Sequence, residues 1–163
     1  MRMLTNAEQN KAQRRLRYWE HTYRRDSLTG LLNHAAFRSD VELKLLEGKS
    51  KIMMLMMDVD RFKAYNDTFG HHEGDKFLIL VAQTLLAALK KEDRACRMGG
   101  DEFAAILFFD KVNITLKTVE GGAGVSMGMV ITESEMTFNQ LYEAADKALY
   151  QAKEHGRGRL AAF

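Results

Sequence analysis

The spacing of apolar residues divides the chain into segments with helical and with strand periodicity. Helices are expected where apolar residues recur every three or four positions, and strands where short apolar runs end at turn residues. We expect helices at 33–48, 74–90 and 139–153, and strands at 52–57, 96–98, 103–109 and 125–131. The run from Ile52 to Met57 has no polar residue, which is typical of a strand buried on both faces. Strands that alternate with helices predict an α/β sheet with helices packed against it.

Residues 1–25 have a different pattern and are expected to form a separate helix. Between Lys11 and Arg25 there are six Lys or Arg residues and one acid, and no glycine. A single apolar stripe runs along this helix, formed by Ala12, Leu16, Trp19 and Tyr23. Three interpretations stay open: a short coiled-coil stalk, a solvated helix with a weak apolar edge, or a basic strip for nucleic acid or membrane.

Composition limits the class of protein further. A chain of 163 residues is long enough for one domain with its own core, which we place at 26–163. The single cysteine, Cys96, excludes a disulfide framework and a cysteine-based metal site, and it fits a cytoplasmic protein. The net charge of +2 does not favour a nucleic-acid partner. No apolar run reaches the ~20 residues of a membrane span, and no signal peptide is evident.

Two groups of acids are candidates for a metal site. Asp58-Val59-Asp60 follows the buried strand directly, at the strand end where α/β sheets usually bind ligands. Carboxylates at short spacing suit a hard cation such as Mg²⁺, with surface turn acids as the alternative. The spacing excludes an EF-hand, whose loop needs an oxygen ligand where Phe62 stands. Asp101 and Glu102, in the Gly-Gly turn, would repel each other unless a cation neutralised them, and Asp101 could share a metal with Asp58.

Cationic and amide side chains suggest a nucleotide as the partner of that metal. Lys153 and Arg157 stand four positions apart at the end of the last helix, where they complement the helix dipole or hold a triphosphate. Lys63 is a third candidate cation. Asn66 together with Asp75 could read guanine, because a carboxylate accepts hydrogen bonds from N1–H and N2–H of that base. Either residue alone would be interpreted as a turn or N-cap residue.

Five ordered blocks resemble the GGDEF family, the diguanylate cyclases. Residues 26–33 resemble the motif D-x-L-T-G-L-x-N, and residues 58–75 resemble the family's D-x-D-x-F-K to G-D stretch. Gly99, Gly100, Asp101, Glu102 and Phe103 spell the signature itself. Residues 125–128 resemble its V-S-x-G strand, and 145–157 resemble its C-terminal block. The resemblance implies a palm-type, ferredoxin-like α/β (α+β) domain with a mostly antiparallel central sheet flanked by helices.

The resemblance also implies an activity, which is the condensation of two GTP into cyclic di-GMP with release of two pyrophosphates. It implies that Asp58, Asp101 and the Val59 carbonyl hold Mg²⁺, with Mn²⁺ as an alternative ion, and that Glu102 assists. Phosphates would be held by Lys63, Lys153, Arg157 and the backbone at Phe62, and guanine by Asn66 and Asp75. Each subunit would bind one GTP, so two subunits must meet as a homodimer, under a sensory domain or regulator outside this chain.

Two departures from the family pattern affect this expectation. Lys90-Lys91-Glu92-Asp93 stands where product-inhibited members carry R-x-x-D, and Lys lacks the planar bidentate grip of Arg, so weak or absent product inhibition is expected from Lys90 and Asp93. Only Asp110–Gly124 is available for a long family helix, and its apolar alternation favours a strand. One sheet face would then be less covered. Two rival functions are a non-catalytic GTP- or cyclic-di-GMP-binding module and a related cyclic dinucleotide synthase.

Overall fold

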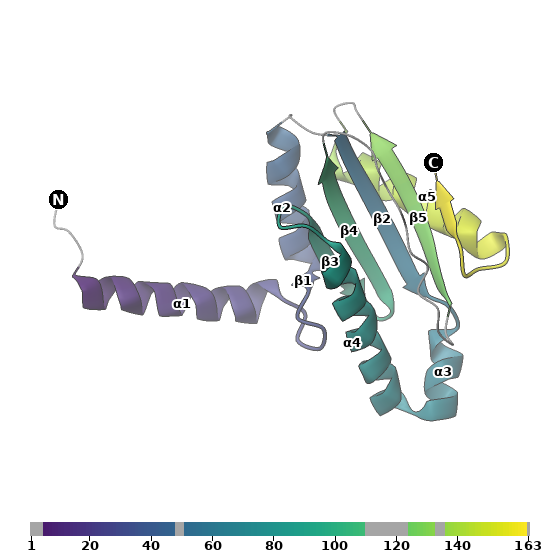
Figure 1. Ribbon diagram of the computed structural model, residues 1–163, viewed down its shortest axis with the longest axis horizontal. Helices are drawn as coiled ribbons and strands as arrows, with labels where there is room; N and C mark the ends of the chain where they lie inside the picture. The colour runs from purple at the N-terminus through teal and green to yellow at the C-terminus, as the bar shows by residue number, and fades with distance from the viewer. Residues whose placement is uncertain (1–4, 48–50, 110–123, 133–135, 163) are drawn as a thin grey trace.

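A six-stranded sheet in the order β1-β3-β4-β2-β5-β6 forms the centre of the molecule (Figure 1). The computed structural model describes residues 5–47, 51–109, 124–132 and 136–162. The four middle strands pair antiparallel, and the short outer strands β1 and β6 pair parallel with β3 and β5. The strands are β1 (Leu32–Asn33), β2 (Lys51–Val59), β3 (Arg94–Gly99), β4 (Glu102–Phe109), β5 (Val125–Thr132) and β6 (Leu160–Ala162). This is the mostly antiparallel sheet that the sequence resemblance implied.

The apolar run of β2 is explained by its place in the sheet. β2 is hydrogen-bonded to β4 on one side and to β5 on the other, so both of its edges are paired. Every residue from Ile52 to Met57 is buried, and alternate side chains enter two separate apolar clusters. Its four methionines are core residues, as expected.

Helices cover both faces of the sheet (Figure 1). α2 (His34–Leu46) and α5 (Phe138–Glu154) pack on one face, where Phe37, Leu141 and Leu149 are buried. α4 (His71–Ala88) packs on the other face through Leu78 and Ala82. The expected helices are confirmed, although α4 begins three residues before Gly74. α3 (Phe62–Phe69), β1 and β6 were not expected from the sequence.

Side-chain caps explain where α2 and α5 begin. The Asn33 side chain accepts a hydrogen bond from the Ala36 amide at 2.9 Å, as its position before the apolar stripe predicts. Thr137 and Gln140 form a reciprocal capping box at the start of α5. Each cap satisfies amides that have no partner within the helix, so both helices have defined starting points.

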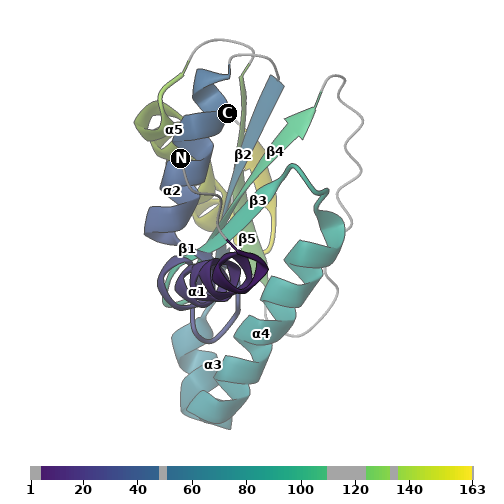
Figure 2. The ribbon, with the colours of Figure 1, turned by 90° about the vertical axis from the view of Figure 1, so that its left-hand side faces the viewer.

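The N-terminal helix α1 (Asn6–Arg24) projects away from the sheet (Figures 1 and 2). Leu16, Trp19 and Tyr23 of its apolar stripe are at least half exposed, with 58%, 50% and 62% of their surfaces accessible. The helix is tied to the domain at its C-terminal end, where Arg24 forms an ion pair with Asp40 of α2. An apolar stripe with this exposure has no partner within the described residues of the chain.

The α4 face of the sheet is only partly covered by the described part of the chain. Val125, Met127 and Met129 of β5 lie on this face and are partly buried. The strand expected within Asp110–Gly124 falls outside the described residues, apart from Gly124 itself. Within the described ranges, no helix combines the length and the apolar character needed to cross a bilayer.

Candidate functional site

Three carboxylates gather where β2 ends. Asp58 is the penultimate residue of β2 and lies opposite Glu102 at the start of β4. Asp101 precedes Glu102 in the turn after β3, and its backbone carbonyl accepts a hydrogen bond from the Val59 amide at 3.2 Å. Gly100 has φ of 54°, which a residue with a side chain rarely adopts, so glycine allows the turn to close. The hairpin therefore brings Asp58, Asp101 and Glu102 together, as the sequence predicted.

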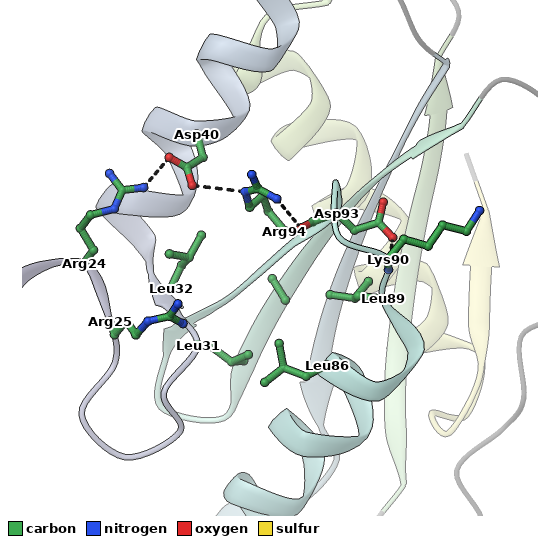
Figure 3. A pocket seen from close by; sticks show the side chains of 11 residues that line it. Arg24, Arg25, Leu31, Leu32, Asp40, Leu86, Leu89, Lys90, Asp93 and Arg94 are labelled. Atoms are coloured by element: carbon green, nitrogen blue, oxygen red, sulfur yellow. Dashed lines mark hydrogen bonds and ion pairs between the residues drawn. The ribbon is translucent and has the colours of Figure 1, made fainter. Parts of the chain in front are cut away.

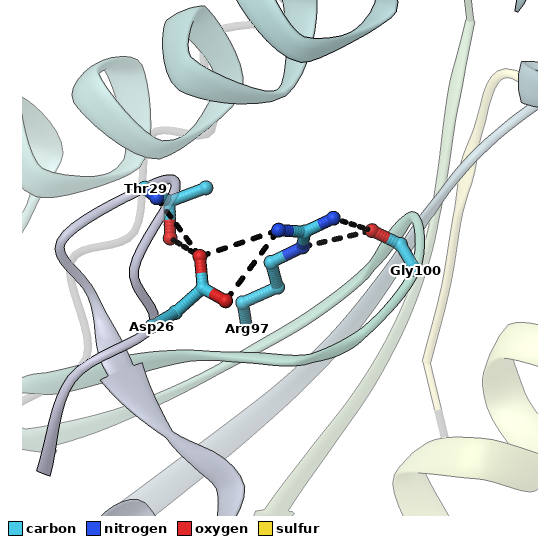
Figure 4. Close-up of polar contacts among 4 residues, drawn as sticks. All are labelled: Asp26, Thr29, Arg97 and Gly100. Carbon is cyan, nitrogen blue, oxygen red and sulfur yellow. Dashed lines mark hydrogen bonds and ion pairs between the residues drawn. The ribbon is translucent and has the colours of Figure 1, made fainter. Parts of the chain in front are cut away.

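Arg97 fixes the shape of this turn (Figure 4). The Arg97 guanidinium donates to the Gly100 carbonyl at 2.6 and 2.8 Å and forms an ion pair with Asp26 at 3.3 Å. Asp26 also accepts hydrogen bonds from the amide and hydroxyl of Thr29. Burial alone raises the pKa of Asp26, but the Thr29 hydrogen bonds and the Arg97 charge outweigh it and lower that pKa.

This link between the first motif and the signature turn was missed by the sequence analysis. Asp26 and Arg97 are 71 positions apart, and each was interpreted within its own segment. The only signal in the sequence was that Arg97 stands between the apolar residues Cys96 and Met98, two positions before Gly99.

α5 brings Lys153 to the carboxylates. The Lys153 ammonium lies 2.7 Å from an Asp58 carboxylate oxygen. α5 ends one residue later, at Glu154, and Arg157 lies in the following turn, where its amide donates to the Ala152 carbonyl at 3.1 Å. The Arg157 guanidinium is half exposed and lies 3.9 Å from Asp60. Lys153 thus contacts Asp58, and Arg157 lies near Asp60, two residues further along the chain.

Burial and mutual repulsion disfavour the ionised forms of Asp58 and Glu102. Burial raises the pKa of Asp58, and Asp101 and Asp60 raise it further, against the lowering effect of Lys153. Burial and the charges of Asp58, Asp101 and Asp146 likewise raise the pKa of Glu102. The site therefore holds more negative charge than Lys153 balances, which is the electrostatic condition for binding a cation.

Replacing Glu102 by glutamine is expected to raise the melting temperature at neutral pH. A carboxylate whose pKa is higher in the folded chain than its ordinary value of 4.5 destabilises the fold above that range. The gain should shrink as the pH falls through 4.5 and disappear below it, where Glu102 of the wild type is protonated in both states.

Thermal unfolding of both proteins across that pH range tests this, and Glu73→Gln is an opposite-sign control. Hydrogen bonding and charge from Lys76 lower the pKa of Glu73, so removing that carboxylate should cost stability at neutral pH rather than add it. If Glu102→Gln lowered the melting temperature at pH 7, the electrostatic account would be wrong.

The residues expected to contact a base, and two of those expected to contact phosphates, lie beyond the end of β2, on α3 and α4. Phe62 and Lys63 begin α3, and Lys63 is exposed. Asn66 packs against Gly74 so closely that a Cβ at Gly74 would lie 1.8 Å from its amide oxygen. That oxygen is buried and has no hydrogen-bond partner, unlike any other buried side-chain oxygen or nitrogen of the described residues. Asp75 follows Gly74 and is exposed, so the structure brings both residues of the expected pair to one place.

Lys90 and Asp93 lie elsewhere, beside a cavity of about 530 Å³ between α1, β1 and the end of α4 (Figure 3). The Asp93 carboxylate is buried and accepts hydrogen bonds from the amides of Lys90 and Phe108, at 2.8 and 3.1 Å. The side chain of Lys90 points away from the arginines of this cavity (Figure 3). Arg24, Arg25 and Arg94 line the cavity, and Asp40 bridges Arg24 and Arg94.

The donor set at the end of β2 fits a magnesium ion that arrives with a nucleotide. Among the described residues, no three His, Cys, Asp or Glu side chains are grouped to hold a metal by themselves. Mg²⁺ is usually held by one or two carboxylates together with phosphate oxygens of its substrate. Asp58 and Asp101 supply two carboxylates, and the unbalanced negative charge at Asp58 and Glu102 favours a cation there.

Comparisons with curated proteins give relatives that share this chain over most of its length. The chain is 33% identical over 160 residues to diguanylate cyclase DgcM of Escherichia coli, with 88% of this chain and 39% of the relative covered. It is 32% identical over 149 residues to the probable diguanylate cyclase DgcJ of the same organism, with 82% and 30% covered. The chain thus spans well under half the length of these relatives.

Solved structures show the same fold. The coiled coil and GGDEF domain of DgcB from Caulobacter crescentus, in complex with c-di-GMP, has a TM-score of 0.83 at 27% identity, with 96% of this chain and 94% of that chain covered. The diguanylate cyclase SiaD of Pseudomonas aeruginosa, in complex with its activator SiaC, has a TM-score of 0.72 at 26% identity, with 95% and 69% covered. The family model described as "Diguanylate cyclase, GGDEF domain" matches residues 23–116, more than half of the sequence, and the chain therefore belongs to the GGDEF family.

Proposed function

We propose that this chain is a diguanylate cyclase domain that condenses two GTP molecules into cyclic di-GMP and two pyrophosphates. The observation that carries the proposal is the arrangement at the end of β2. Asp58, Asp101 and Glu102 lie beside Lys153, which is 2.7 Å from Asp58, and Arg157 lies 3.9 Å from Asp60, two residues after Asp58. Acids that could hold a metal and cations that could hold phosphates are what nucleotidyl transfer requires.

In this proposal the 3′-hydroxyl of each GTP attacks the α-phosphate of the other, and pyrophosphate leaves. Asp58, Asp101 and the Val59 carbonyl would hold Mg²⁺ or Mn²⁺. When bound, that ion lowers the pKa of the attacking hydroxyl and stabilises charge on the phosphate. Lys63, Lys153 and Arg157 hold the triphosphate with the backbone at Phe62. Asp101 favours removal of the hydroxyl proton, and Glu102 supports it.

Guanine is assigned to the helix pair α3 and α4. The Asn66 amide oxygen is buried and has no partner, so the Asn66 side chain must rotate to offer a hydrogen bond to a base. The exposed Asp75 carboxylate can accept from N1–H and N2–H of guanine, which adenine does not offer. Competition between GTP and ATP separates a diguanylate cyclase from a synthase of another cyclic dinucleotide.

The reaction needs two subunits, and we infer that α1 helps to join them as a parallel coiled coil. Its stripe of Leu16, Trp19 and Tyr23 is exposed and continues in heptad spacing. The structural relative DgcB is described with a coiled coil, which supports this interpretation over a solvated helix or a basic strip.

Deleting residues 1–25 is therefore expected to convert dimers to monomers at micromolar concentration. Leu16→Glu together with Trp19→Glu should have the same effect, because charges at those positions cannot pack against a second helix. Light scattering with size exclusion measures this, and Tyr18→Glu is the control, since Tyr18 is exposed but lies off the stripe. An unchanged mass for both altered proteins would reject the stalk.

Weak or absent product inhibition is also proposed. The Asp93 carboxylate is occupied by two backbone amides, and Lys90 cannot grip phosphate as arginine does. Asp93→Ala is expected to lower thermal stability and to leave the concentration of cyclic di-GMP that inhibits turnover unchanged. Initial rates at increasing cyclic di-GMP decide this. Strong inhibition of the wild type that disappears in Asp93→Ala would contradict it.

The experiment for the proposed function is a turnover assay. Purified protein is incubated with GTP and Mg²⁺ at several protein concentrations, and products are separated by HPLC. Cyclic di-GMP is expected, with a rate that rises more than linearly with protein concentration if the dimer is the active form. Calorimetric binding of GTP without turnover would favour the non-catalytic regulatory module.

GTP as the substrate and a buried, unpaired Cys96 both fit the cytoplasm.

A further inference from the structure

Asp60 is a buried acid that the proposed reaction does not use. Its exposed fraction is 8%, and both carboxylate oxygens accept hydrogen bonds. The Ser126 hydroxyl donates to one oxygen at 2.6 Å, and the Gly158 amide donates to the other at 2.9 Å. Buried carboxylates are rare, and one whose oxygens both bind donors of the same chain holds those donors in place.

The donors come from segments that are distant in sequence. Ser126 belongs to β5, and Gly158 lies in the turn between α5 and β6. The Asp60 amide also donates to the Gly124 carbonyl at 2.8 Å, and the Gly158 amide lies 3.3 Å from the Ser126 hydroxyl. A Cβ at Gly124 would lie 2.9 Å from the Asp60 carboxylate, so the packing leaves little room for another arrangement.

Backbone strain lies on both sides of this carboxylate. Within the described residues, only Arg61 and Arg157 have positive φ without being glycine, at 57° and 61°. Arg61 follows Asp60, and Arg157 precedes Gly158, whose amide Asp60 binds. Non-glycine residues keep this conformation only where the surroundings hold them in it. The hydrogen bond from Gly158 to Asp60 holds the turn at Arg157, together with the bond from the Arg157 amide to the Ala152 carbonyl.

We propose that Asp60 is a positioning residue that clamps the turn after α5 and so directs Arg157 towards the nucleotide phosphates. This rests on the proposed function, in which Arg157 binds phosphate. The Arg157 guanidinium lies 3.9 Å from Asp60, too far for a direct hydrogen bond, and is half exposed. Asp60 thus acts through the backbone at Gly158 and leaves the guanidinium available for a phosphate.

The clamp predicts a difference between alanine and asparagine at position 60. Asparagine can accept from the Gly158 amide with its oxygen and donate to the Ser126 hydroxyl with its nitrogen, so it can keep the turn. Alanine leaves both donors without a partner. If the Asp60 carboxylate instead bound a metal directly, alanine and asparagine would lower nucleotide affinity equally, because both remove the negative charge.

Affinity for 3′-deoxy-GTP with Mg²⁺, measured by calorimetry, separates these roles without turnover. Asp60→Ala is expected to weaken binding about tenfold, the size of losing a charge-assisted contact, while Asp60→Asn stays within about threefold of the wild type. Ser126→Ala, which keeps the Gly158 bond, should lie between them. In an Arg157→Ala background, Asp60→Ala should add less than about twofold, because the two changes remove the same contact.

Thr137→Ala is the matched control for lost stability. It removes the cap at the opposite end of α5, so it should lower the melting temperature and leave nucleotide affinity unchanged. Cleavage of the Arg157–Gly158 bond by trypsin without nucleotide, followed by mass spectrometry, gives a second readout. Cleavage there should be faster in Asp60→Ala than in the wild type or Thr137→Ala.

The outcomes that overturn the proposal are specific. Equal loss of affinity in Asp60→Asn and Asp60→Ala, or a full tenfold loss added to Arg157→Ala, would reject a positioning role. A wild type that binds no nucleotide would reject the proposed function and the phosphate role of Arg157 with it. The trypsin experiment then tests the clamp independently of nucleotide binding. An unchanged rate of cleavage after Arg157 in Asp60→Ala would reject the clamp.

Discussion

Replacing Asp101 by alanine is expected to abolish cyclic di-GMP formation, with turnover reduced by about 10³-fold or more. Asp101 lies in the turn whose carbonyl binds the Val59 amide, and its charge is close enough to raise the pKa of Asp58. In the proposed reaction, the alanine removes both a metal ligand and the group that favours deprotonation of the 3′-hydroxyl. No neighbouring group replaces it, since Glu102 is already needed beside it.

HPLC of the products from GTP and Mg²⁺ measures this effect, with Asp146→Ala as the control. Asp146 is an exposed acid on α5 whose charge also reaches Glu102, so its removal changes the local field without removing a proposed ligand. We expect that control to keep turnover within about threefold of the wild type. Normal turnover by Asp101→Ala would exclude the proposed role of this residue.

The same variant helps to separate the rival functions. If the wild type binds GTP but forms no product, the only quantity to compare between Asp101→Ala and the wild type is metal-dependent GTP binding. A regulatory module would still lose affinity for the GTP–metal complex, because the carboxylate is lost in both cases. The turnover of the wild type, and not the binding of the variant, therefore decides between a cyclase and a regulatory module.

Much of the fold follows from local signals that the sequence states directly. The apolar run at Ile52–Met57 predicts a central strand, because only a strand paired on both edges and covered on both faces can bury every residue. Asn33 predicts the start of α2, since its side chain competes for the first free amides. The meeting of Asp58 with Asp101 and Glu102 follows from a hairpin that lies beside the strand ending at Asp58.

Other features could not be predicted because their causes are distant in sequence or weak. α3 has no buried residue, so its periodicity does not stand out, and the residue that precedes it, Arg61, is left-handed. β6 is three residues long, and it follows the turn in which the Gly158 amide donates to Asp60, so its pairing with β5 depends on contacts that are distant in sequence. The pairing of Arg97 with Asp26 joins segments 71 positions apart, which neither periodicity nor propensity encodes.

Replacing Gly128 by alanine is expected to destabilise the fold by about 3 kcal/mol, at the upper end of the cost of overpacking. α5 crosses β5 directly over Gly128, where a Cβ would lie 2.1 Å from the Leu149 amide nitrogen and 2.3 Å from the Ala145 carbonyl oxygen. Both contacts are with backbone atoms, so no rotation of a side chain can relieve them. The helix must move, and Lys153 lies one turn beyond Leu149.

Chemical denaturation gives the free energy of unfolding, and Met129→Ala is the control. Met129 follows Gly128 directly, but its side chain lies on the opposite face of β5 and is partly buried. Met129→Ala should therefore leave α5 in place and lower the free energy of unfolding by about 1–2 kcal/mol. Gly128→Ala should also weaken the ion pair of Lys153 with Asp58, because that 2.7 Å contact depends on how closely α5 approaches the sheet. A loss below about 1 kcal/mol would mean that α5 can shift without cost, and the position of Lys153 would then not depend on this glycine.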